Sequence, residues 1–187
     1  MNGLLKHIPN LLTGMRLACA PALALLLMSG ADKAALGIFA FAGLSDAADG
    51  FLAKRYNYMT RFGRFLDPAA DKLLMLASFV ALSAARATPV WLAALVIGRD
   101  VAIVAGILLA RLLELPIKIE PLFIGKASTA VQIVYIGFVL VVLAFGLGWP
   151  GILHVASIAT AVATLASWLA YAALFVHALG VRRSRAA

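Results

Sequence analysis

Apolar stretches of about twenty residues recur along the whole chain, and this repetition most limits how it can fold. A helix of that length crosses a hydrocarbon core of roughly 30 Å. Hydrophobic residues make up 64% of the 187 positions, whereas soluble domains average closer to one half. The pattern therefore predicts an all-α polytopic membrane protein, with a single transmembrane domain over residues 1–187. The six predicted membrane-spanning helices are Leu11–Met28, Ala34–Ala53, Asp67–Ala85, Val90–Leu113, Ser128–Leu147 and Ile152–Leu179.

The distribution of Lys and Arg orients these helices, because cytoplasmic loops of membrane proteins carry an excess of both residues. With both termini in the cytoplasm, the outer connections hold only Lys33 and Arg86. The inner side then receives Lys6, Lys54, Arg55, Arg61, Arg64, Lys72, Arg111, Lys118, Lys126, Arg182, Arg183 and Arg185. We accordingly assign the net charge of +8 to loops and anionic headgroups, and we expect no nucleic-acid partner.

Four aspartates lie close together in this apolar chain. Asp46 and Asp49 are three residues apart near the inner end of the second predicted helix, and Asp67 and Asp71 are four apart at the start of the third. Each spacing puts the pair on one face of its helix, and the short connection predicts antiparallel neighbours. Carboxylates this close repel one another unless something neutralises them. Because carboxylate oxygens suit Mg²⁺ and Mn²⁺, the aspartates predict a divalent-metal site at the cytoplasmic side.

The same residues also fit roles that need no such site. The aspartates could cap helices, as Asp67 before Pro68 would, or pair with neighbouring Lys and Arg side chains. Membrane carboxylates also occur in ion and proton transporters, although such sites usually lie near the middle of the bilayer. Gly50, Ala53 and Gly63 could admit a ligand close to the backbone, or could simply let helices pack tightly.

One segment resembles the signature of the CDP-alcohol phosphotransferases, or CDP-alcohol phosphatidyltransferases: Asp46-Ala-Ala-Asp49-Gly50-Phe-Leu-Ala53, followed by Gly63, Asp67 and Asp71. The resemblance implies a six-helix fold in which the four aspartates hold two Mg²⁺ or Mn²⁺ ions. It also implies that Asp71 is the general base that takes the proton of the acceptor hydroxyl. The residues implied to contact the CDP-linked substrate are Asp46, Gly50, Ala53, Lys54 and Gly63. Lys54 departs from the usual Arg of the family, which keeps the charge but loses the bidentate fork.

Three further stretches bear on the acceptor alcohol. The first is the opening Ile8-Pro9-Asn10-Leu11-Leu12-Thr13 with Arg16, which is similar to that of phosphatidylglycerophosphate synthases and eukaryotic-type cardiolipin synthases. Arg16 should face the interior of the helix bundle and contact a lipid phosphate, or else extend to the inner interface. The residues expected to bind an acceptor or lipid phosphate are Thr13, Arg16, Arg99, Lys126 and Thr129.

The second stretch is Arg99-Asp100, which resembles the cardiolipin synthase branch. Adjacent helical residues do not face the same side, so we do not expect these two to pair with each other. Arg99 should instead reach a phosphate or an active-site carboxylate, while Asp100 orients a basic neighbour. The third stretch contains Lys126 and Thr129, one turn apart at the inner start of the fifth helix, and is similar to motifs of both branches. These two residues could bind an acceptor phosphate, or could cap the helix and extend to the interface.

The resemblance therefore implies a phospholipid-synthesising transferase. It would move a phosphatidyl group from CDP-diacylglycerol to phosphatidylglycerol, giving cardiolipin and CMP. The alternative acceptor is glycerol 3-phosphate, which would make the chain a phosphatidylglycerophosphate synthase. We expect an integral protein of a bacterial inner membrane with its active site facing the cytoplasm, and small lipid-facing residues would permit a homodimer.

Overall fold

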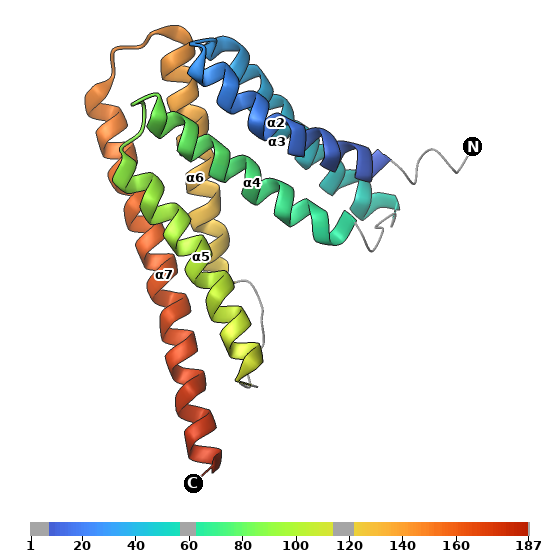
Figure 1. The fold of residues 1–187 in the computed structure, drawn as a ribbon, viewed down its shortest axis with the longest axis vertical. Helices are drawn as coiled ribbons and strands as arrows, with labels where there is room; N and C mark the ends of the chain where they lie inside the picture. Colours follow the sequence, from blue (N-terminus) through green and yellow to red (C-terminus); the bar gives the residue numbers. More distant parts are fainter. Residues whose placement is uncertain (1–7, 57–62, 114–121, 187) are drawn as a thin grey trace. The chain divides into compact units, whose positions relative to one another are not determined.

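The computed structural model describes the backbone of residues 8–56, 63–113 and 122–186, and the side chains of residues 14–45, 70–113 and 122–180. Within these ranges every regular element is an α-helix (Figure 1), which confirms the all-α prediction. The helices are α2 (Ile8–Met28), α3 (Asp32–Tyr56), α4 (Gly63–Ala84), α5 (Val90–Leu112), α6 (Phe123–Phe145) and α7 (Pro150–Ala186).

Among the residues with described side chains, three helical segments are long and apolar enough to cross a membrane. They are α5, α6 and the Pro150–Gly180 part of α7, with mean hydropathies of 2.2, 2.2 and 1.7. Gly14–Met28 of α2 is a shorter apolar segment. Large apolar side chains such as Leu112 and Phe123 are more than three-quarters exposed, which suits contact with lipid rather than water. The chain is therefore built as an integral membrane protein.

The start of α4 differs from the sequence prediction. The helix begins at Gly63, four residues before Asp67, so Asp67 is a helical residue and the idea that it caps this helix is wrong. Pro68 lies in the second turn of α4, where its missing N–H removes one intrahelical hydrogen bond. The practical result is that Asp67 and Asp71 both lie on continuous helix, one turn apart.

The first compact unit comprises residues 1–88 and 136–149, and its described core joins three helices. Both α3 and α4 pack along α2, so the three run side by side (Figure 1). Ala20 of α2, Ala42 of α3 and Leu74 of α4 form one buried cluster. Small residues at two of these positions let the helix backbones approach closely, the usual way in which membrane helices associate.

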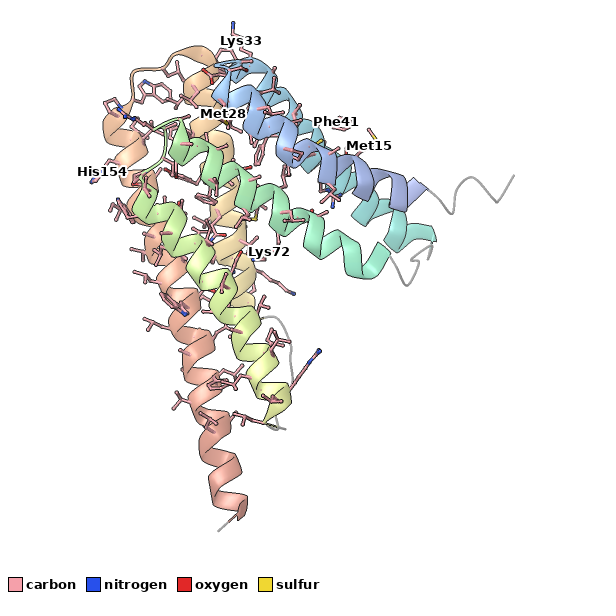
Figure 2. All side chains as sticks on the ribbon, in the orientation of Figure 1. Met15, Met28, Lys33, Phe41, Lys72 and His154 are labelled. Carbon is pink, nitrogen blue, oxygen red and sulfur yellow. The ribbon has the colours of Figure 1, made fainter. Side chains whose placement is uncertain are left out.

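Three connections in the chain share one way of ending a helix. After α2, Ala31 donates its N–H to the carbonyl of Leu26 and Gly30 adopts a φ of 72°. The same pattern ends α6, where Gly146 has a φ of 62°. It also ends α4, where Arg86 takes the left-handed conformation that glycine usually supplies. Figure 2 shows the first of these turns between Met28 and Lys33, with Met15 and Phe41 projecting from the outer sides of α2 and α3.

The second compact unit comprises Pro89–Tyr135 and Pro150–Ala187. Here α5 packs along α7, and a row of buried polar side chains follows α7. This row consists of Ser157, Thr160, Thr164 and Ser167. Their alternating spacing of three and four residues is that of a helix face turned toward neighbouring helices. Gln132 of α6 meets the row by donating from its Nε2 to the Thr164 Oγ1 at 3.0 Å.

Candidate functional site

The first unit contains a buried arginine that holds one of the four aspartates. The Nη1 of Arg16 on α2 donates to the Oδ1 of Asp71 on α4 at 2.7 Å. Arg16 is 2% exposed, which confirms that it faces the interior and shows that its extension to the interface was the wrong alternative. The Asp71 side chain, by contrast, is 44% exposed. Asp71 thus combines an ion pair to a buried arginine with partial exposure of its side chain.

The other three aspartates lie on α3 and α4, but their side chains fall outside the described residues. Asp46 and Asp49 are on the second half of α3, and Asp67 is on the second turn of α4. The same limit applies to the remaining residues predicted to bind CDP or phosphate near them, namely Gly50, Ala53, Lys54, Gly63 and Thr13. Among the described side chains, no group of three metal-capable residues occurs.

Helix register nevertheless relates the aspartates to the described core. Arg16 lies one turn from Ala20 along α2, and Asp71 lies one turn from Leu74 along α4. Ala20 and Leu74 both belong to the buried apolar cluster. On α3, Asp46 is one turn beyond Ala42, the third member of that cluster. Arg16, Asp46 and Asp71 therefore each lie about one helical turn from the cluster at which α2, α3 and α4 pack together.

A second buried arginine, Arg99 on α5, organises the polar residues of the second unit. It is 3% exposed, and its Nη1 donates to the Oδ1 of Asp100 at 2.6 Å. The expectation that these neighbours would not pair is therefore wrong. Although adjacent residues leave a helix in different directions, the long Arg side chain bends back to the carboxylate, which pairs a buried charge that would otherwise be uncompensated. Asp100 was expected to orient a basic residue other than Arg99, whereas the observed contact is with Arg99 itself.

Two residues of α7 complete the surroundings of Arg99. The Ser167 Oγ accepts from the Arg99 Nε at 3.2 Å and from its Nη2 at 2.6 Å. The guanidinium carbon also lies 5.9 Å from the centre of the Tyr171 ring, within range of a cation–π contact. Sequence reasoning missed both partners. The spacing of Thr160, Thr164, Ser167 and Tyr171 at three- and four-residue intervals was the signal that could have found them.

Lys126 and Thr129 lie in the first two turns of α6, as predicted. Lys126 is exposed. Thr129 is half-buried and donates its hydroxyl to the carbonyl of Gly125 at 3.1 Å. Of these two candidate phosphate ligands, Lys126 is thus the exposed one, whereas Thr129 donates its hydroxyl proton to the helix backbone.

Comparison with known proteins supports the resemblance seen in the motif. Residues 6–179 match the sequence profile described as CDP-alcohol phosphatidyltransferase. A cardiolipin synthase (CMP-forming) of Rattus norvegicus is 34% identical, covering 88% of this chain and 60% of the relative. The Homo sapiens cardiolipin synthase (CMP-forming) is 37% identical, covering 69% of this chain and 48% of the relative.

A bacterial relative is named for a different activity. A probable phosphatidylglycerophosphate synthase of Mycobacterium tuberculosis is 34% identical, covering 86% of this chain and 76% of the relative. The chain spans only about half to three-fifths of the two mammalian relatives, so the match concerns the part that they share. Because the family profile nevertheless covers almost the whole of this sequence, the chain belongs to the CDP-alcohol phosphatidyltransferase family.

Proposed function

We propose that this chain is a metal-dependent phosphatidyltransferase that makes cardiolipin from CDP-diacylglycerol and phosphatidylglycerol. The free hydroxyl of phosphatidylglycerol attacks the lipid-side phosphorus of CDP-diacylglycerol, a new P–O bond forms, and the bond to CMP breaks. Family membership supports the transfer reaction, and the two mammalian relatives, both CMP-forming cardiolipin synthases, favour this acceptor. Membership in a transferase family also favours this function over that of an ion or proton transporter.

The observation that carries the proposal is the pairing of Arg16 with Asp71. A general base must be fixed in position and must also be reachable by the proton that it removes. The 2.7 Å contact with Arg16 supplies the first condition, and the 44% exposure of the Asp71 side chain supplies the second. We assign Asp71 the role of accepting the proton of the acceptor hydroxyl, and Arg16 the role of orienting its carboxylate.

The donor set suits divalent metal ions. Four carboxylates lie at three- and four-residue spacing on two helices that pack against the same third helix, and carboxylate oxygen is the ligand that Mg²⁺ and Mn²⁺ prefer. Two ions, held by Asp46, Asp49, Asp67 and Asp71, would neutralise the charge on the phosphate oxygens during transfer. The CDP group would then lie along residues that combine small side chains with one Lys, namely Gly50, Ala53, Lys54 and Gly63.

The candidates for binding the acceptor phosphate are charged or hydroxyl-bearing residues, and each belongs to one of the two units. Lys126 is the best-supported of these, because its side chain is exposed near the start of its helix. Thr13 and Thr129 are further candidates. Arg16 and Arg99, also expected to meet a phosphate, are both buried and already engaged with carboxylates.

The proposal includes a membrane arrangement. Six membrane-spanning helices with both termini in the cytoplasm would place the aspartates at the cytoplasmic surface, where a water-soluble CMP can leave. The distribution of Lys and Arg supports this orientation. We propose a bacterial inner membrane as the location, and we keep a homodimer as a prediction that cross-linking in the membrane can test.

The test is release of CMP by the purified protein in lipid nanodiscs. With CDP-diacylglycerol, Mg²⁺ or Mn²⁺, and phosphatidylglycerol, we expect CMP and cardiolipin in equal amounts, and no CMP after the metal is chelated. Release with glycerol 3-phosphate but not with phosphatidylglycerol would overturn the choice of acceptor. That outcome would support the second candidate, phosphatidylglycerophosphate synthesis, which the Mycobacterium tuberculosis relative favours.

A further inference from the structure

Arg99 is surrounded by hydrogen-bond acceptors from three helices of the second unit. Its Nη1 donates to Asp100, its Nε to Ser167, and its Nη2 to both Ser167 and, at 3.4 Å, the carbonyl of Gly125. The residue is 3% exposed. Most of its five N–H groups are therefore directed to protein atoms in the interior, and the guanidinium has little capacity left for an incoming phosphate.

These partners converge on the first turn of α6. The N–H of Leu122, directly before the helix, donates to the Tyr171 Oη at 3.3 Å. The Leu122 carbonyl in turn accepts from the N–H groups of Gly125 and Lys126. A helix start lacks intrahelical partners for its first N–H groups, and here the side chain of another helix supplies one. Arg99 and Tyr171 together tie this turn to α5 and α7.

The surroundings of Gly125 leave little room for a side chain. A Cβ at this position would lie 2.8 Å from the Tyr171 Oη and 3.3 Å from the Arg99 Nη2, so either side chain would have to shift. The missing side chain of Gly125 therefore favours the close approach of Arg99 and Tyr171 to this turn. Lys126, the exposed candidate for binding phosphate, is the next residue along the chain.

We propose that Arg99 is a positioning residue: held by Asp100, Ser167 and Tyr171, it fixes the first turn of α6 and thereby places Lys126 to bind the acceptor's phosphate group. The proposal rests on the function proposed above and narrows it, because Arg99 acts through Lys126 instead of touching the phosphate. Loss of the arrangement should weaken acceptor binding while leaving the donor and the chemical step unchanged.

The first experiment compares two serines of α7. Ser167→Ala removes an acceptor of Arg99, whereas Ser157→Ala removes an equally buried hydroxyl that donates to the carbonyl of His154 on its own helix. We expect Ser167→Ala to raise the KM for phosphatidylglycerol about tenfold, with kcat and the KM for CDP-diacylglycerol unchanged. Ser157→Ala should change none of these constants. An equal effect of both substitutions, or a fall in kcat alone, would overturn the proposal.

The second experiment asks whether the effect passes through Lys126. If it does, Ser167→Ala should raise the acceptor KM in the wild type but have almost no further effect in Lys126→Ala. An effect of the same size in both backgrounds would show that Arg99 acts independently of Lys126. A wild-type protein that releases no CMP with either acceptor would instead refute the proposed function itself, so the two failures are distinguishable.

A third experiment uses Gly125. Gly125→Ala should raise the acceptor KM because the added Cβ displaces the Tyr171 hydroxyl, and Gly125→Ala with Tyr171→Phe should recover part of the loss by removing the crowded oxygen. The apparent unfolding temperature, measured in parallel, separates this effect from general destabilisation. No recovery in a double variant that unfolds at the same temperature as Gly125→Ala would contradict the close-approach role of Gly125.

Discussion

Arg16 and Arg99 are both almost fully buried in helices of an apolar protein, yet their surroundings differ. Arg16 pairs across helices with Asp71, whose side chain is 44% exposed. Arg99 pairs within its own helix with Asp100, whose side chain is 20% exposed, and further donates to a serine and a backbone carbonyl. The carboxylate paired with Arg16 is therefore the more exposed of the two. Arg99 has its charge neutralised inside the second unit.

The difference shows that burial and charge alone do not assign a role. A buried charge in a membrane protein is costly, so both arginines must be paired. What separates them is the accessibility of the partner. We expect the more exposed carboxylate, Asp71, to take part in the chemistry, and the less exposed one, Asp100, to act through the geometry that it maintains. This contrast leads to four predictions, from the largest expected effect to the smallest.

Asp71→Asn should reduce kcat for CMP release by about 10³-fold, because loss of a general base typically costs 10² to 10⁴. The amide keeps the shape of the side chain and can still accept from Arg16. The apparent unfolding temperature should fall by only a few degrees, because the buried Arg16 loses a charged partner but keeps a hydrogen-bond acceptor. The measurement is CMP release under saturating substrates. Activity within tenfold of wild type would remove Asp71 from the base role.

Arg16→Lys should reduce kcat by roughly tenfold to a hundredfold, since a hydrogen bond to a charged group is worth about 1.5–3 kcal/mol. Lysine keeps the positive charge but loses the planar fork that reaches Asp71. The reduction should disappear in an Asp71→Asn background if Arg16 acts by orienting that carboxylate. Additive losses would mean that Arg16 has a separate role, such as direct contact with a lipid phosphate.

Asp100→Asn should show the opposite pattern to Asp71→Asn, with a stability loss that exceeds its effect on kcat. Removing one partner of a buried pair costs about 3–5 kcal/mol, and the partial exposure of Asp100 reduces this to about 2 kcal/mol. We expect the apparent unfolding temperature to fall by about 5 °C. Thermal unfolding followed by intrinsic fluorescence in nanodiscs provides the measurement. A large fall in kcat without destabilisation would erase the contrast between the two aspartates.

Thr164→Val should have the smallest effect. The substitution keeps the shape of the side chain but removes the hydroxyl that accepts from Gln132. Hydrogen bonds between membrane helices average only about 0.6 kcal/mol. The unfolding temperature should accordingly drop by about 1–2 °C with unchanged kinetic constants. A drop larger than that of Asp100→Asn would show that the polar row along α7 stabilises the second unit more than the Arg99 group does.

Sequence reasoning placed every described helix within a few residues of its observed bounds. The main exceptions were the starts of α4 and α6, which lie four and five residues earlier than predicted, and the end of α7, which extends past Leu179. Each of these ends contains a charged residue, Arg64, Lys126 or Arg182, that interrupts the apolar run used to predict it, while the helix itself continues. The aspartate motif also led to the correct family, because its spacing is long and specific.

What the sequence by itself determined is therefore the class of the protein, its helical organisation and the residues that could carry its chemistry. Those properties follow from apolar length, helical spacing and charge, all of which are local. Only the tertiary structure decided the partners: Arg16 with Asp71, and Arg99 with Asp100, Ser167 and Gly125. Such pairings join residues up to 68 positions apart, and their geometry depends on how helices pack, which no local pattern specifies.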